Sequence, residues 1–176
     1  MFIDLLRTRR SIRQFRDRPV EPEKVDLLIE AALRSPSSRG RCPWEIVVVT
    51  NPQTIARLAL AKPSGAELLR GAPLVMVVCA DPRVSDVWIE DAAIATTLLH
   101  LEAHDLGLGS CWVQVRLRPH DEQSTAEDYV ARVLDLAPGI TVEAMLGIGY
   151  PAEAKPEHPA TSLLWQKVRR EAPGPR

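Results

Sequence analysis

The sequence predicts one domain of the α/β or α+β class, a sandwich in which a small sheet is flanked by helices. Three observations support this fold class. Helical and strand patterns alternate along the chain, the predicted strands are few, and two of them are continuous apolar runs that need cover on both faces. The 176 residues are enough to bury one substantial core, so we expect a single domain.

Two helices are predicted before the first strand. Residues 2–8 carry apolar residues on one side of a short helix, and residues 21–33 repeat apolar residues at helical spacing. Pro22 and Glu23 suit the first turn of the second helix. Residues 35–41, which are rich in serine, proline, glycine and arginine, then form a loop.

The first two strands follow this loop. Residues 44–50 are rich in valine and isoleucine, and the run Ile46–Val49 is apolar on both faces, so we expect this strand to be covered on both sides. A weaker helical pattern comes after Asn51 and Pro52. Residues 74–80 form the second strand, which is apolar throughout.

The next helix, which runs to about Asp105, is predicted to be deeply buried. Ser85 or Asp86 can cap its start, and Gly107 suits a left-handed residue after its end. Residues 92–101 make this helix apolar nearly all round, and one small domain offers little room for such a helix. The centre of a dimer interface offers more room, which favours a homodimer.

Residues 110–115, 125–134 and 141–150 complete the pattern as a strand, a helix and a strand. The composition changes at Pro151, the first of five prolines that forbid regular structure over most of the remaining chain. Leu163, Leu164 and Trp165 are nevertheless too apolar for a disordered tail. We therefore divide the chain into residues 1–150 and a C-terminal arm of the same domain, residues 151–176, that lies on another surface such as a second subunit.

The most informative stretch is the arginine-rich segment near the N-terminus. Six of the first 18 residues are arginine, although the net charge of the whole chain is only −1. In an extended segment Arg9, Ser11 and Arg13 share one face and Ile12 turns toward the core. Two guanidinium groups beside a hydroxyl suit a dianionic phosphate. The alternative from these residues alone is a solvated basic face beside a helix.

Other candidate sites are disfavoured. His100 and His104 have the spacing of a metal-binding pair on a helix, but no third ligand is indicated, so we expect no metal. Cys42 follows two arginines, and nearby positive charge can make a thiol more reactive, yet no histidine lies nearby in the sequence. Neither a Rossmann glycine motif nor a P-loop is present.

The bulk composition excludes several partners. Net charge near zero argues against nucleic acid, and the longest apolar run, residues 72–80, is about half of a membrane span. Three cysteines without a Cys-x-x-Cys pair argue against a disulfide framework, and the first residues do not form a signal-peptide core. We expect a cytoplasmic protein that has neither nucleic acid nor membrane as a partner.

Taken in order, five sequence blocks resemble the FMN-dependent nitroreductase family, in particular its short single-domain members. The resemblance covers nearly the whole chain. Its blocks are Arg9-Arg10-Ser11-Ile12-Arg13-Gln14-Phe15, Ser35-Pro36-Ser37-Ser38 with Pro43-Trp44, Trp88 with Glu90-Asp91-Ala92-Ala93, Leu106-Gly107-Leu108-Gly109-Ser110-Cys111-Trp112, and Gly147-Ile148-Gly149-Tyr150-Pro151-Ala152-Glu153.

The resemblance implies a small central sheet flanked by helices, in an intertwined homodimer with two FMN sites built by both subunits. It implies that Arg9, Ser11 and Arg13 hold the FMN phosphate with Arg10 close by. Gly149, Lys155 and, more weakly, His158 would lie near the phosphate. Pro36, Ser37 and Ser38 would reach the flavin from the partner subunit. Val113, Gln114 and Val115 would lie near its reactive face, mainly through their backbone.

The implied activity is reduction of nitroaromatic, quinone or similar electron-poor acceptors by NADH or NADPH, in a ping-pong mechanism without a catalytic side chain. The same fold also supports enone reduction, dehalogenation and dehydrogenation, or a flavin-binding module without turnover. The chain departs from the family at Gly40, where asparagine is frequent, and at Cys42, where glutamine is frequent. Gln114 replaces a common glycine and could narrow the substrate pocket.

Overall fold

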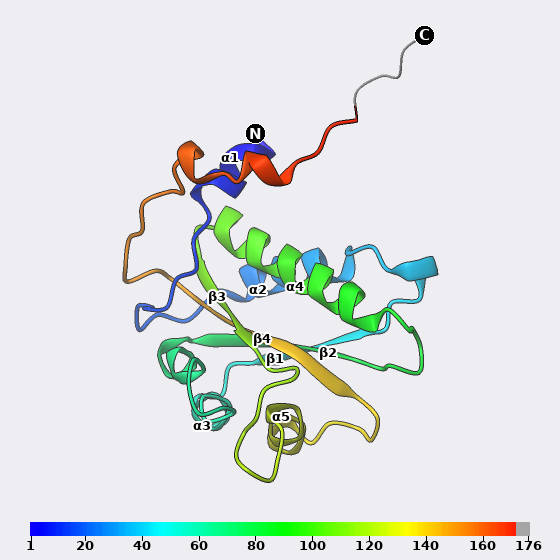
Figure 1. The fold of residues 1–176 in the computed structure, drawn as a ribbon. Helices are drawn as coiled ribbons and strands as arrows, with labels where there is room; N and C mark the ends of the chain where they lie inside the picture. The colour runs from blue at the N-terminus through cyan, green and yellow to red at the C-terminus, as the bar shows by residue number, and fades with distance from the viewer. Residues whose placement is uncertain (172–176) are drawn as a thin grey trace.

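The computed structural model describes residues 1–171 and is built on a four-stranded antiparallel sheet (Figure 1). The strand order is β1-β2-β4-β3, with β1 at Trp44–Val49, β2 at Leu74–Ala80, β3 at Gly109–Gln114 and β4 at Thr141–Gly149. The helices are α1 (Phe2–Thr8), α2 (Pro22–Leu33), α3 (Pro52–Leu58), α4 (Trp88–Asp105) and α5 (Ala126–Leu134), with short 3-10 helices η1 (Ser38–Gly40), η2 (Glu67–Gly71), η3 (Ala160–Ser162) and η4 (Trp165–Lys167).

The sheet separates two apolar cores, because successive side chains of a strand point to opposite faces. In β2 the side chains of Val75 and Val77 pack toward α3 and α5, whereas those of Leu74 and Met76 pack toward α2 and α4. Every residue of β2 is buried. The result is a three-layer sandwich (Figure 1), which confirms the predicted small sheet flanked by helices. Because all strand pairs are antiparallel, the α+β alternative is the correct one.

Strand β1 was expected to be covered on both sides, and its cover is only partial: Val47 and Val49 pack into the core on the α3 and α5 side and Ile46 into the other. It lies at one edge of the sheet, beside β2 only, and Val48 remains 36% exposed. The apolar run of β1 is similar to that of β2. Because β1 is an edge strand, it lies at the border of the two helix layers and not between their centres. Composition indicates a strand here, and its position in the sheet depends on partners distant in sequence.

The start of α4 also differs from the prediction. The helix begins at Trp88, after Val87, and neither Ser85 nor Asp86 caps it. The Ser85 hydroxyl instead donates to Asp91 Oδ2 at 3.2 Å, inside the first turn. At the other end Gly107 has a φ of 73°, the left-handed conformation expected after a helix.

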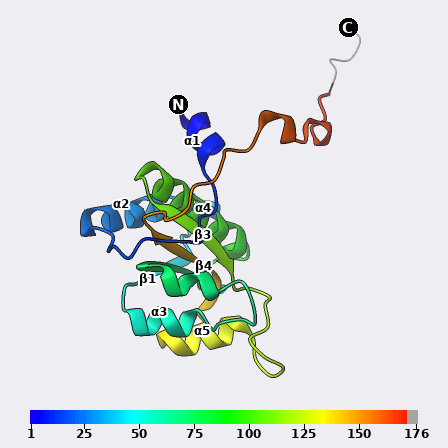
Figure 2. The same cartoon turned by 90° about the vertical axis from the view of Figure 1, so that its left-hand side faces the viewer.

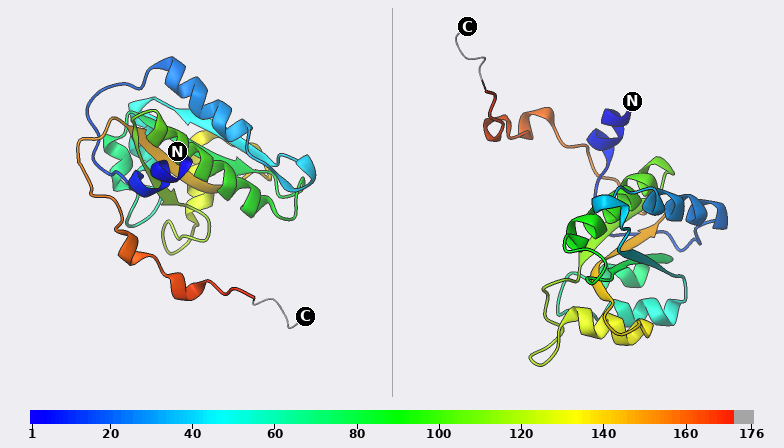
Figure 3. Two further views of the ribbon diagram at one scale, coloured as in Figure 1. Left: turned by 90° about the horizontal axis from the view of Figure 1, so that it is seen from above. Right: turned by 90° about the vertical axis from the view of Figure 1, so that its right-hand side faces the viewer.

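Helix α1 and the C-terminal arm extend from the body of the domain (Figure 2). The arm leaves the sheet after β4 and continues outward as a chain with two short turns (Figure 3). Its apolar side chains are exposed, Trp165 by 64%, and so are those of α1, Phe2 by 66%. The last five residues of the predicted arm, residues 172–176, lie outside the described residues.

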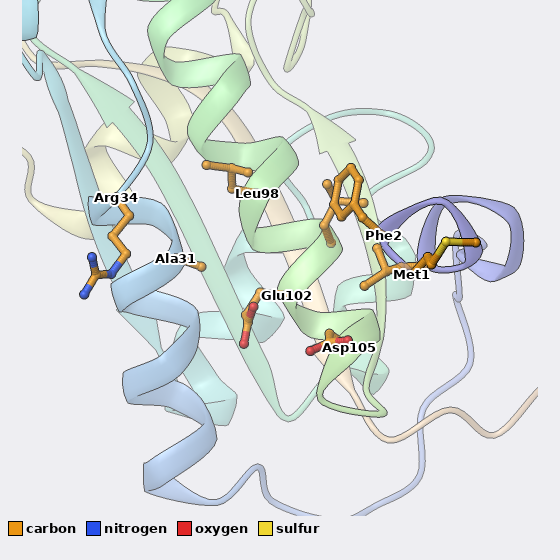
Figure 4. A pocket seen from close by; sticks show the side chains of 9 residues that line it. Met1, Phe2, Ala31, Arg34, Leu98, Glu102 and Asp105 are labelled. Atoms are coloured by element: carbon orange, nitrogen blue, oxygen red, sulfur yellow. The ribbon is translucent and has the colours of Figure 1, made fainter.

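An open groove of about 500 Å³ separates α1, α2 and α4 (Figure 4). Phe2 of α1 and Leu98 of α4 give it apolar walls, while Arg34, Glu102 and Asp105 supply charged groups at its border. Helix α4 is therefore buried against the sheet on one side, and its opposite side borders the open groove. Within residues 1–171, no helix combines the length and apolar character that crossing a membrane requires.

Candidate functional site

The arginine-rich segment is held between two neighbours that are far away in the sequence. On one side the Ile12 backbone N–H donates to the carbonyl oxygen of Ser110 in β3, at 2.9 Å. On the other side Lys155 Nζ donates to the carbonyl oxygen of Ser11, at 2.7 Å. Ile12 is only 9% exposed, which confirms that it turns toward the core. The segment is thus fixed at the free edge of β3.

Several cations gather around this segment. Arg9, Arg10 and Arg13 come from the segment itself, and Lys155 comes from the start of the arm. Arg10 donates from its guanidinium to the carbonyl oxygen of Pro156, while the Arg13 side chain is exposed. Arg9, Ser11 and Lys155 are half-buried, so their charges and hydroxyl are partly shielded from water. Arginine and lysine side chains of this kind can make charge-assisted hydrogen bonds to an anion.

A single carboxylate, that of Glu153, shapes the segment from the opposite side. The backbone N–H groups of Arg13 and Gln14 donate to Glu153 Oε1 at 2.5 and 3.2 Å, and Lys155 Nζ lies 3.3 Å from the same oxygen. The hydrogen bond from Arg13 is the main cause that lowers the pKa of Glu153 below its ordinary value. Glu153 is therefore ionised at neutral pH and orders the backbone that carries Arg13.

The guanidinium of Arg9 contacts His100 on α4. Arg9 Nη1 lies 2.7 Å from His100 Nε2, and His100 Nδ1 is hydrogen-bonded to the hydroxyl of Ser110. An arginine can only donate, so Nε2 must accept and the proton of the neutral imidazole must be on Nδ1. Burial, and secondarily the charges of Arg9 and His104, lower the pKa of His100 to about 4.

The second histidine of the pair considered for metal, His104, contacts Thr8 Oγ1 at 2.8 Å. His100 thus contacts the segment after α1, and His104 contacts the last residue of α1. Across residues 1–171, no cluster of three or more histidine, cysteine or acidic side chains has an arrangement that could hold a metal ion.

The low pKa of His100 predicts a specific acid sensitivity. Unfolded histidine titrates near 6.5, so between pH 6.5 and about 4 the unfolded chain binds a proton that the folded chain does not, and stability falls as the pH falls. From pH 6.5 to 5 we expect this residue to lower the free energy of unfolding by about 1–2 kcal/mol. Urea unfolding of the protein and of His100→Gln measures it: the variant should lose less stability over this interval, and equal losses would contradict the assignment.

The free edge of β3 presents backbone groups beside the cationic segment. Alternate residues of a strand direct their N–H and C=O to opposite neighbours. Because Ser110 C=O points outward to Ile12 and Val115 N–H points inward to Glu143, Trp112 and Gln114 direct their backbone groups outward. The side chains of Val113 and Val115 are buried in the core on the α3 and α5 side. Of the three predicted residues, Gln114 therefore offers backbone groups to a ligand at this edge.

The Gln114 side chain is held within the protein. Trp112 Nε1 donates to Gln114 Oε1 at 2.9 Å, and Gln114 Nε2 donates to the carbonyl oxygen of Arg116 at 3.2 Å. The amide also lies 3.5 Å from the carboxylate of Glu143, whose pKa is raised mainly by burial. The side chain that replaces a common glycine is thus fixed by three neighbours.

The serine loop lies at the other end of α4. The Ser38 backbone N–H donates to Asp91 Oδ1 at 2.8 Å, in the first turn of α4, and the Cys42 N–H donates to the Ser37 hydroxyl at 2.9 Å. Pro36 is exposed. Asp91 precedes His100 by nine residues, which corresponds to about 14 Å along a helix axis. A single chain therefore places the predicted loop residues and the arginine-rich segment at opposite ends of α4.

Two glycines allow close approach around the segment. A Cβ on Gly109 would lie 2.7 Å from Ile12 Cβ and Cγ2, and a Cβ on Gly149 would lie 2.6 Å from Pro73 Cδ. The two glycines face each other across β3 and β4. Packing alone thus requires glycine at Gly149, and its contact with phosphate stays a prediction. His158 lies farther along the arm, in the cleft between the arm and α1.

Two residues of this site have no role in the sequence-based prediction. His100 carries only the spacing of a metal pair, and Glu153 is part of a quoted block without an assigned function. Their partners, Arg9 and Arg13, are 91 and 140 residues away in the chain. A local signal does exist for Glu153, because a carboxylate two residues before Lys155 suggests an ion pair.

The amino-acid sequence is similar to those of known proteins. The sequence model of the Nitroreductase family matches residues 6–63 and 60–150. A protein of Methanothermobacter thermautotrophicus, whose name pairs NADH dehydrogenase with NAD(P)H nitroreductase, is 31% identical over 95% of this chain and 84% of its own length.

Two solved structures extend the comparison. An FMN-dependent nitroreductase from Clostridium difficile R20291 superimposes with a TM-score of 0.95 at 41% identity, covering 97% of this chain and 99% of that chain. A protein from Desulfovibrio desulfuricans, solved in complex with FMN, superimposes with a TM-score of 0.75 at 26% identity, covering 99% of this chain and 98% of that one.

Proposed function

The chain belongs to the nitroreductase family, and from this premise we propose that it is an FMN-dependent oxidoreductase that uses NAD(P)H to reduce nitroaromatic, quinone or similar electron-poor acceptors. The single observation that carries the proposal is the cationic segment fixed at the free edge of β3, formed by Arg9, Ser11 and Arg13 with Lys155. It has the charge and the donors that an organic phosphate requires.

The residues present fit FMN. Arg9, Ser11, Arg13 and Lys155 would hold the phosphate, and the outward backbone groups of Gln114 would meet the ring system. FMN, when bound, supplies the redox chemistry by accepting a hydride from NAD(P)H and passing electrons to the acceptor. The protein binds and orients the cofactor, and its cations favour the negative charge that grows on reduction. No side-chain acid or base is assigned.

A homodimer would complete the site. The loop residues Pro36, Ser37 and Ser38 lie at the opposite end of α4 from the segment, so a second chain would have to supply them to the same flavin. The exposed apolar residues of α1 and the arm, together with the groove along α4, provide surface for that second chain. A protomer that exposes this much apolar surface is typical of one that associates.

Spectroscopy and kinetics test the proposed function together. The purified protein, or protein mixed with FMN, should show flavin absorbance that bleaches when NADH or NADPH is added without oxygen and returns when a quinone or nitroarene is added. Double-reciprocal plots against both substrates should be parallel, as a ping-pong mechanism requires.

Each other outcome has a definite meaning. Intersecting lines would contradict the ping-pong scheme. A yellow protein that neither nicotinamide bleaches would show a flavin-binding module without turnover. A protein that rejects FMN altogether would overturn the proposal. Reduction of enones without reduction of nitroarenes or quinones would reassign the reaction within the same family.

The cytoplasm stays the predicted location of the protein.

A further inference from the structure

We propose that His100 is a positioning residue for the cofactor phosphate: its neutral imidazole bridges Ser110 and Arg9 and so fixes the Arg9 guanidinium against α4. The inference rests on the proposed FMN function and adds to it a residue that would not touch the cofactor. It depends on a chain of contacts that crosses three elements, from β3 through α4 to the segment after α1.

The two hydrogen bonds of His100 have defined directions. Arg9 Nη1 donates to His100 Nε2 over 2.7 Å, and His100 Nδ1 in turn donates to the hydroxyl of Ser110. Ser110 is only 2% exposed and belongs to β3, whose backbone is paired with β4. The imidazole is thus anchored on the paired strand β3 at one nitrogen and holds the Arg9 side chain at the other.

The contact with His100 leaves part of the Arg9 guanidinium free to bind a ligand. A guanidinium has five N–H donors in a planar fork, and the contact with His100 is made by Nη1. The remaining edge can still bind a phosphate in bidentate fashion. Because long arginine side chains lose rotamer freedom on binding, an arginine already held by a neighbour binds its ligand more tightly.

The charge state of His100 decides whether the bridge to Arg9 can form. The groups that act on His100 are Arg9, from the segment after α1, and His104, from α4 itself, while β3 contributes the neutral Ser110. A protonated imidazole could not accept from Arg9 and would repel it. Burial and the Arg9 charge keep the pKa of His100 near 4, so the bridge is intact at neutral pH.

The test compares two ligands that differ by the phosphate. We expect His100→Leu, which fills the space but accepts no hydrogen bond, to raise the dissociation constant of FMN about ten-fold. Binding of riboflavin, which lacks the phosphate, should change by less than about two-fold. His100→Gln offers an acceptor at a similar position and should restore most of the FMN affinity. In an Arg9→Ala background, His100→Leu should have no further effect.

The matched control is His104→Leu, the same change one turn along α4, where the histidine contacts Thr8 instead of Arg9. It should leave FMN affinity unchanged. An unchanged FMN affinity of His100→Leu, or an equal loss for riboflavin, would overturn the positioning role. If the unaltered protein rejects FMN, the proposed function itself fails, so the two failures are distinguishable.

A second measurement does not depend on any variant that might misfold. Nitrogen NMR of the FMN-free protein at pH 7 reports which imidazole nitrogen carries the proton. The bridge requires a proton on Nδ1 of His100 and a lone pair on Nε2. A proton on Nε2 would rule out the bond from Arg9 and with it the proposal.

Discussion

Replacing both Arg9 and Arg13 with alanine should weaken FMN binding about 100- to 1000-fold. Each guanidinium supplies charge-assisted hydrogen bonds worth about 1.5–3 kcal/mol, and the two flank one phosphate in the proposed site. The two effects are expected to add incompletely, because both residues act on the same group. Titration of the FMN-free protein with FMN, followed by flavin fluorescence, measures the change.

The control for lost positive charge is Arg57→Ala with Arg132→Ala. These arginines are exposed on α3 and α5, on the opposite side of the sheet from α4. The control should bind FMN normally, and riboflavin affinity should be similar in all three proteins. An Arg9 and Arg13 variant that retains its FMN affinity would contradict the phosphate site and return these arginines to a solvated basic face.

The second large effect is expected from Gly109→Ala, which adds one methyl group in β3. The new Cβ would lie 2.7 Å from Ile12 Cβ and Cγ2, well inside van der Waals contact. Ile12 therefore has to shift, and because it lies between Ser11 and Arg13 and its N–H donates to Ser110, the shift displaces the arginine-rich segment as well. Overpacking of this kind costs about 1–3 kcal/mol, and FMN binding has to restore the displaced segment against that cost, so FMN affinity should fall about 30-fold.

A compensating change tests the mechanism. Ile12→Gly in the Gly109→Ala background removes all three clashing atoms, Cβ included, and should restore most of the lost FMN affinity. Gly71→Ala is the matched control, because a Cβ there has no neighbour within 4 Å, and it should have no effect. If the double variant binds FMN as weakly as Gly109→Ala alone, displacement of Ile12 is not the cause.

Local patterns in the sequence predict most of the elements. The apolar run of β2, the helix predicted at residues 125–134 and the left-handed Gly107 are set by residues close together in the chain, and all appear as expected. The edge position of β1 could not be predicted in this way. Sheet neighbours are chosen by pairings between residues far apart, and an apolar strand has the same composition at the edge as at the centre.

In the site, too, residues close together in the chain could be predicted and contacts between distant residues could not. Arg9, Ser11 and Arg13 are evident from a five-residue stretch, whereas the role of His100 depends on a partner 91 residues away. Spacing along α4 raised only a metal pair, which the lack of a third ligand disfavoured, because two histidines one turn apart have the same spacing whether they face an ion or an arginine. Val113, Gln114 and Val115 were predicted to meet the flavin mainly through their backbone, and strand alternation in β3 shows that Gln114 is the one of the three whose backbone groups face outward.

The separation of the two halves of the site along α4 has a genetic consequence. In the proposed two-fold assembly, each flavin takes its phosphate anchor from one polypeptide and its serine loop from the other. An allele damaged in the anchor and an allele damaged in the loop would therefore complement each other when expressed in one cell. The mixed assembly would combine both defects in one site and leave the other site fully wild-type.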